Sequence, residues 1–135
     1  MNVLIDTNLI VYMLDVTSPK EKRDKATELI NRLWGKACIG AQSLAEAYWV
    51  LARKAKMDQE SAEEAMGELA AGFEIIPYDG NDTLEAMRIS RQHHTYFWDA
   101  LLGAAALRNE IVEVLTEDIS DFRRIPGLKA ENPFE

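Results

Sequence analysis

The chain begins with NVLIDTNLI (residues 2–10), and this stretch decides how the rest of the sequence is interpreted. The apolar run within 2–6 predicts a short buried strand, and apolar residues at helical spacing over 7–15 predict a helix directly after it. Asp6 stands where the strand ends and the helix begins. It is either the N-cap of that helix or a functional carboxylate, and its own position does not decide between the two.

Strands and helices alternate along the whole chain. Further helices are expected over 18–35, 43–56, 58–72, 82–93 and 97–109, and further strands over 37–40, 73–77, 112–116 and 127–133. This alternation is typical of a parallel sheet with helices on both faces. We therefore predict a three-layer α/β/α sandwich with a central parallel sheet. Because the sequence has no repeat and no linker-like run, we expect a single domain over residues 1–135.

Composition limits the class of protein. There are 15 Lys and Arg residues against 23 Asp and Glu residues, which gives a net charge of −8. That charge alone argues against a nucleic-acid partner, unless part of it belongs to a metal site that neutralises it. The single Cys38 permits no internal disulfide. With no signal-peptide pattern and no run long enough to span a bilayer, we expect a cytoplasmic protein without membrane contact.

Two acidic residues follow predicted strands. Binding sites of open parallel sheets lie beyond the carboxyl ends of the strands. Asp6 occupies such a position after the first strand, and Asp118 does so after the strand at 112–116. A turn or an N-cap is the alternative explanation for Asp118. Asp121, three residues later, competes with it for any functional role.

Two further acids lie on otherwise apolar helices. Glu46 is the only charged residue between Lys36 and Arg53, although Ser43 as an N-cap would give it a place in a capping box. Asp99 begins a helix made almost entirely of alanine, leucine and glycine. A carboxylate on a buried helix is unfavourable unless it is paired, hydrogen-bonded or bound to a metal. The interaction with the helix dipole offsets only about 0.3–1 kcal/mol of this.

A doubly wound topology brings these positions to one end of the sheet. The acids concerned are Asp6, Glu46, Asp99 and Asp118. Without a metal, carboxylates around one cleft repel one another and raise their own pKa values. Mg²⁺ and Mn²⁺ prefer oxygen ligands, and one or two such ions can activate water for an in-line attack on a phosphodiester. The pattern therefore predicts a metal-dependent site for a phosphodiester substrate.

Several segments, taken in order, resemble the PIN-domain ribonucleases and are most similar to the VapC-type toxins of toxin–antitoxin modules. These segments are LIDTNLIVYMLD (4–15), SLAEAYWVL (43–51), YFWDALLGAAAL (96–107), VLTEDISDF (114–122) and PGLKAENPF (126–134). Their order and spacing carry the resemblance, which covers essentially the whole chain. It implies a compact α/β/α sandwich, metal-dependent endonucleolytic cleavage of RNA, a homodimer and an antitoxin partner.

The resemblance also implies roles for particular residues. It matches the acidic quartet of the family to Asp6, Glu46, Asp99 and Asp118. Asp121 is the alternative for the fourth acid, and Asn8 and Thr116 match polar positions that flank such sites. The implied mechanism has three of the acids as ligands of Mg²⁺ or Mn²⁺. Glu46 then coordinates a second ion or orients the attacking water.

Two other functions fit the same residues. A receiver-like phospho-acceptor domain also gathers acids at strand ends, but receivers usually carry paired acids near the start and a lysine after a late strand. Here Asp6 stands alone and Thr116 is followed by Glu117 and Asp118. A catalytically degenerate PIN-like module that binds RNA or protein is the second alternative. Intact acids at all four positions argue against it.

Overall fold

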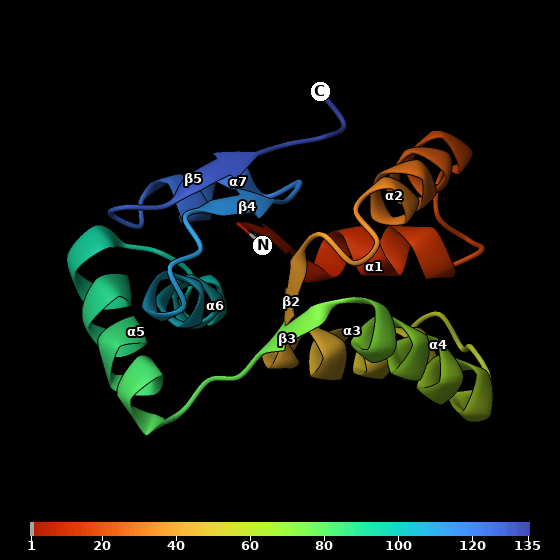
Figure 1. Ribbon diagram of the computed structural model, residues 1–135, viewed down its shortest axis with the longest axis horizontal. Coiled ribbons are helices and arrows are strands. Elements are labelled where there is room, and N and C mark those ends of the chain that lie inside the picture. Colours follow the sequence, from red (N-terminus) through yellow and green to blue (C-terminus); the bar gives the residue numbers. More distant parts are fainter. Residues whose placement is uncertain (1) are drawn as a thin grey trace.

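A five-stranded parallel sheet lies at the centre of the computed structural model, which describes residues 2–135 (Figure 1). Its strands are β1 (Val3–Ile5), β2 (Cys38–Gly40), β3 (Glu74–Ile76), β4 (Glu113–Leu115) and β5 (Lys129–Glu131). They lie in the order β3-β2-β1-β4-β5, and each neighbouring pair is parallel. Every strand falls inside its predicted range, which confirms the predicted α/β architecture.

Helices cover both faces of this sheet, as predicted (Figure 1). One face packs against α1 (Thr7–Leu14), α2 (Lys20–Arg32), α3 (Ala41–Arg53) and α4 (Gln59–Gly72). The other face packs against α5 (Gly80–His93), α6 (Phe97–Arg108) and the short α7 (Ile119–Arg123). Strand residues alternate between the two cores, so Leu4 and Val114 face α6 while Ile5 and Leu115 face α1. None of the helices in residues 2–135 has both the length and the hydropathy that crossing a bilayer requires.

The strand order fixes where a site can form. From β1 the chain builds outward through β2 and β3, then crosses back to β4 on the other side of β1. The switch point therefore lies between β1 and β4, and ligands of such sheets bind beyond the strand ends at this point. Receiver-like domains have the order 2-1-3-4-5. The receiver-like alternative is therefore wrong.

The register aligns the strand ends at the switch point. Ile5 pairs with Ile39 of β2 and with Leu115 of β4, so β1 and β4 end at the same level and β2 ends one residue later, at Gly40. The pairing continues one residue further, because the backbone N–H of Asp6 donates to the carbonyl of Leu115 at 3.0 Å. Thr116 continues β4 in the same way. The two residues that follow these strands are thereby held at the carboxyl edge of the sheet.

Helix α6 is buried on all sides, as its composition predicts. Every residue from 100 to 106 is buried, and α6 packs between the sheet and α5. Small residues allow this close approach. A Cβ atom on Gly40 would lie 2.5 Å from the Cδ1 atom of Leu102, so glycine at the end of β2 lets α6 pass close to the sheet. The start of α6, where Asp99 lies, is thus held against the carboxyl edge.

Candidate active site at the carboxyl edge of the sheet

A pocket of about 380 Å³ opens at the carboxyl edge beside the switch point. All of the predicted quartet line it, namely Asp6, Glu46, Asp99 and Asp118. They come from the end of β1, the second turn of α3, the first turn of α6 and the turn after β4. Asn8 lines the same pocket, together with apolar side chains that include Val11 and Val50. Residues separated by up to 112 positions in the sequence are therefore brought to one site.

Asp6 is both a helix cap and a member of the pocket. Its side chain is 8% exposed. Oδ1 accepts a hydrogen bond from the backbone N–H of Thr7 at 2.8 Å, and Oδ2 accepts one from Oγ1 of Thr116 at 2.7 Å. Burial raises the pKa of Asp6 to about 6, although both hydrogen bonds act to lower it. The two explanations of Asp6 are therefore not exclusive, since each oxygen keeps a further lone pair.

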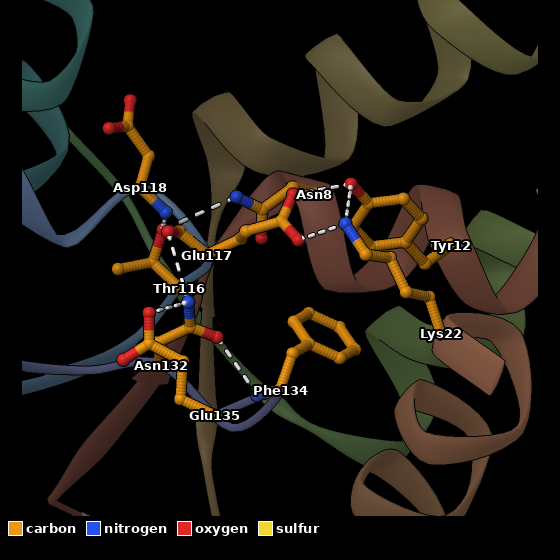
Figure 2. Close-up of polar contacts among 9 residues, drawn as sticks. All are labelled: Asn8, Tyr12, Lys22, Thr116, Glu117, Asp118, Asn132, Phe134 and Glu135. Carbon is orange, nitrogen blue, oxygen red and sulfur yellow. Dashed lines mark hydrogen bonds and ion pairs between the residues drawn. The ribbon is translucent and has the colours of Figure 1, made fainter. Parts of the chain in front are cut away.

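Thr116 is the structural centre of the site. It is fully buried, and its hydroxyl donates to Asp6 while it accepts from the backbone N–H of Asp118 at 3.0 Å. It also accepts from Nδ2 of Asn8 at 3.3 Å (Figure 2). One hydroxyl group thus joins the end of β1, helix α1 and the turn after β4. These contacts give Thr116 and Asn8 a supporting place beside the acids.

Glu46 does not form the capping box that its distance from Ser43 suggests. Helix α3 begins at Ala41 with Gly40 as its N-cap, and no side chain caps it. Glu46 is instead exposed at the pocket, where Oε1 accepts from Nε2 of Gln42 at 3.1 Å. The same Nε2 donates to the backbone carbonyl of Trp98 at 2.9 Å. Gln42 therefore links Glu46 to the residue before Asp99, a function that the sequence analysis missed.

Asp99 carries the strongest electrostatic perturbation of the site. It is partly buried, and its Oδ2 atom is buried without a hydrogen-bond partner among the described residues. Burial, together with the negative charges of Asp6 and Asp118, raises the pKa of Asp99 to about 8. Among residues 2–135, no lysine, arginine or histidine lines the pocket to offset these charges. The carboxylate is therefore unfavourable for the fold unless a cation binds.

Asp118 and Asp121 both lie close to Asp99. Carboxylate oxygens of the three residues lie within 4.8 Å of one another. Asp121 already accepts a hydrogen bond from the backbone N–H of Tyr96 at 3.1 Å, which ties α7 to the start of α6. Asp118 is exposed and lines the pocket, and its side chain makes one long contact, from Ser120 at 3.4 Å. Asp118 is the less constrained of the two.

The donor set of this pocket fits a hard divalent cation. Carboxylate oxygens dominate it, and such oxygens are the ligands that Mg²⁺ and Mn²⁺ prefer. Three oxygens of its lining residues, Oδ2 of Asp99, Oδ1 of Asn8 and Oε1 of Gln42, are buried and make no hydrogen bond within residues 2–135. A cation would satisfy such atoms and would offset the repulsion that raises the pKa values of Asp6 and Asp99.

Solved structures with the same fold include a toxin–antitoxin complex and a sarcin–ricin loop cleaving toxin. A toxin–antitoxin complex from Klebsiella pneumoniae is 19% identical, with 98% of each chain covered and a TM-score of 0.72. FitAcB from Neisseria gonorrhoeae is 20% identical, with 98% of this chain and 99% of that chain covered and a TM-score of 0.74. VapC20 of Mycobacterium tuberculosis, a sarcin–ricin loop cleaving toxin, is 15% identical over 86% of this chain and 91% of its own, with a TM-score of 0.71.

Sequence comparison identifies the family. No curated protein was found to match the chain. A family model described as the PIN domain matches residues 3–128, which include all five of the acids discussed above. This agrees with the segments on which the resemblance rested. The chain belongs to the PIN domain family.

Proposed function

We propose that the protein is a metal-dependent endoribonuclease that acts as the toxin of a toxin–antitoxin pair. The observation that carries this proposal is the convergence of four acids on one pocket that no cationic side chain among residues 2–135 lines. Membership of the PIN domain family supports a nuclease. The similar structures described as toxin–antitoxin complexes, and one described as a sarcin–ricin loop cleaving toxin, support RNA as the substrate and an antitoxin as a partner.

Asp6, Asp99 and Asp118 would hold Mg²⁺ or Mn²⁺ through their carboxylate oxygens, with Oδ1 of Asn8 close by. Bound there, the ion supplies charge stabilisation at the phosphate and lowers the pKa of a bound water. The hydroxyl of Thr116 donates to Oδ2 of Asp6 and so orients this carboxylate. Asp121 is the alternative ligand to Asp118, because one of its carboxylate oxygens lies within 4.8 Å of those of Asp99 and Asp118.

Glu46 takes a different part in this mechanism. It is exposed in the pocket and is oriented by Gln42, so its carboxylate can accept a hydrogen bond from the attacking water and then the proton of that water. The apolar side chains of Val11 and Val50 border the same pocket and limit the access of bulk water. No histidine, cysteine or serine nucleophile is required.

We further propose a homodimer and a cognate antitoxin, in the cytoplasm. The aromatic side chains of Trp49, Tyr96 and Trp98 are between 46% and 59% exposed. Burying these aromatic side chains against a second copy or an antitoxin would favour association. Light scattering on the isolated chain tests the dimer, and co-expression with the neighbouring small reading frame tests the antitoxin.

The proposal is tested by RNA cleavage with single substitutions. We expect Asp6→Asn and Asp99→Asn each to lower the rate of cleavage of total bacterial RNA in Mg²⁺ by at least about 100-fold, because each removes a direct ligand. EDTA is expected to abolish cleavage by the wild type. Glu60→Gln, an exposed acid on α4, is the matched control and should keep full activity. Cleavage retained by both aspartate variants would contradict the assignment.

A degenerate binding module remains the competing proposal, and metal binding distinguishes it. A nuclease of this kind binds Mn²⁺ in the acidic pocket, and the affinity falls in Asp99→Asn. A module without a metal site gives no heat of binding when Mn²⁺ is titrated into the wild type. RNA binding without Mn²⁺ binding and without cleavage would favour the module.

A further inference from the structure

A cluster of side chains beside the acidic pocket joins four separate segments of the chain (Figure 2). Tyr12 comes from α1, Lys22 from α2, Glu117 from the turn after β4, and Phe134 from the end of the chain. We call these four residues the clamp. The proposed mechanism uses none of them. Their contacts nevertheless converge on the turn that carries Thr116 and Asp118.

Glu117 is held at both oxygens of its side chain. Oε1 accepts a hydrogen bond from the hydroxyl of Tyr12, and Oε2 accepts one from Nζ of Lys22. Nζ of Lys22 lies 5.0 Å from the ring centroid of Tyr12 and 5.7 Å from that of Phe134. The two rings meet edge to face, with centroids 5.3 Å apart. The cation of the pair therefore lies within the distance at which both aromatic rings attract it.

The charged side chains of the clamp are less exposed than those of an ordinary surface ion pair. The side chains of Lys22 and Glu117 are 37% and 30% exposed, whereas the pair of Lys20 and Asp24 on the same helix is 79% and 60% exposed. Exposed pairs contribute little to a fold. A partly shielded carboxylate with two donors, one of them charged, fixes its side chain more firmly.

The backbone of Glu117 is fixed as well. Nδ2 of Asn132 donates to the carbonyl of Glu117 at 3.4 Å, and Oδ1 of Asn132 accepts from the backbone N–H of Phe134 at 2.9 Å. The end of the chain thus holds the turn and places the aromatic ring of the clamp at the same time. The turn after β4 is held from its side chain and from its main chain.

Glu117 stands between the two site residues of this turn. Thr116 precedes it and binds Asp6, and Asp118 follows it and donates its backbone N–H to Thr116. Helix α1 contacts the turn twice, through Asn8 to Thr116 and, one helical turn later, through Tyr12 to Glu117. A rotation of the main chain at residues 116–118 would therefore disturb the contacts that hold Glu117.

We propose that the clamp positions the turn of residues 116–118, and thereby the carboxylate of Asp118 and the hydroxyl of Thr116, for the acidic site. The alternative is that Lys22 binds a phosphate of the substrate. Tyr12 lines the pocket but Lys22 does not, and the ammonium group of Lys22 is bound to Glu117. These contacts favour positioning. The catalytic part of this inference rests on the proposed function, and the structural part does not.

The structural part is tested by amide hydrogen exchange at Asp118 in the metal-free protein. Tyr12→Phe removes only the hydroxyl, and Glu117→Gln removes only the charge. We expect each to speed exchange of the Asp118 amide by about 10-fold, because local opening of the turn becomes easier. Matched controls are Tyr78→Phe, a half-exposed tyrosine, and Asp24→Asn, which breaks the exposed pair on α2. Unchanged exchange in both clamp variants would overturn the proposal.

The kinetic part uses cleavage of total RNA in Mg²⁺. We expect Glu117→Gln and Tyr12→Phe to lower kcat by about 10-fold with little change in KM, since supporting residues of metal sites have effects of this size. A phosphate-binding Lys22 predicts the opposite pattern. Glu117→Gln would then free the lysine and lower KM, while Lys22→Met would raise KM. That pattern would overturn positioning.

The two proposals fail in different ways. A wild type that neither binds Mn²⁺ nor cleaves RNA removes the proposed function, and the exchange of the Asp118 amide still decides whether the clamp positions the turn. A wild type that cleaves RNA, with clamp variants equal to it in both exchange and kcat, leaves the function standing and removes the clamp. Faster exchange together with lower kcat in the clamp variants supports both.

Discussion

The two ends of α6 hold a buried carboxylate in opposite ways. At its end, Asp82 is 3% exposed and accepts two hydrogen bonds from Arg108, at 2.7 and 2.8 Å. The hydrogen bonds from Arg108 hold the pKa of Asp82 below its usual range. At its start, Asp99 has other acids as neighbours, an unpartnered oxygen and a pKa raised to about 8.

Asp82 therefore stabilises the fold, whereas the charged form of Asp99 destabilises it. Asp82 also completes the capping box of α5 through a reciprocal pair of hydrogen bonds with the N-cap Asp79, so all of its contacts are internal. Asp99 gains nothing comparable from residues 2–135. A buried acid that lacks a cationic partner inside the protein indicates a cation from outside it.

Breaking the ion pair of Arg108 and Asp82 should have the largest effect on stability. We expect Arg108→Met to lower the melting temperature by roughly 5–10 °C, because it leaves the buried carboxylate of Asp82 without its partner. Mn²⁺ affinity should not change, since Arg108 lies at the far end of α6 from Asp99. Differential scanning calorimetry and a Mn²⁺ titration measure the two. A melting temperature equal to that of the wild type would show that Asp82 is not a structural acid.

Removing the charge of Asp99, at the start of α6, should change stability in the opposite direction. In EDTA at pH 8, we expect Asp99→Asn to raise the free energy of unfolding by about 1–2 kcal/mol, after a large discount for solvent screening of a partly exposed group. This corresponds to a rise of roughly 3–8 °C in melting temperature. The measurement is thermal unfolding without metal. A melting temperature several degrees lower would instead make Asp99 a structural residue.

The pH dependence of stability follows from the same shift. The pKa of Asp99 is raised from 3.8 to about 8 in the folded chain, and that of Asp6 from 3.8 to about 6. The contribution of these two side chains to the free energy of unfolding is therefore fully present below about pH 4 and is lost as the pH rises through 6 and then 8. The metal-free wild type should lose stability between pH 5 and pH 8, and Asp99→Asn should lose less. Urea unfolding at pH 5 and pH 8 tests this. An equal loss of free energy of unfolding in the two proteins would contradict it.

The smallest effect distinguishes the two candidates for the fourth acid. We expect Asp118→Asn to weaken Mn²⁺ binding by about 10-fold or more, and Asp121→Asn by less than about threefold. The side chain of Asp121 already serves as a hydrogen-bond acceptor for Tyr96, and asparagine keeps that role. Calorimetric titration measures both. The reverse order of affinities would assign the fourth position to Asp121.

The sequence predicts local structure and the site acids better than it predicts their contacts. Alternating strands and helices indicated the parallel sheet, and the apolar surroundings of Asp99 singled it out. The strand order could not be predicted, because it depends on long-range packing. The general rule about strand ends predicted that the acids lie together, and the resemblance to a known family matched the same four residues.

Where the sequence was misleading, tertiary packing overrode a local pattern. Ser43 and Glu46 have the spacing of a capping box, but Ser43 is fully buried and α3 begins at Ala41, directly after β2. The position of Asp6 did not decide between an N-cap and a functional carboxylate, and Asp6 both caps α1 and lines the acidic pocket. The hydroxyl of Thr116 and the clamp join residues about 100 positions apart, which no local pattern reveals.

The most direct test of this account is a titration of Mn²⁺ into the metal-free wild type and into Asp99→Asn, followed by thermal unfolding of each with and without the metal. We predict that the wild type binds Mn²⁺ and gains melting temperature from it. Asp99→Asn should bind at least about 10-fold more weakly and melt above the wild type in EDTA. A wild type that does not bind Mn²⁺, or an Asp99→Asn variant that binds equally well, would contradict the account.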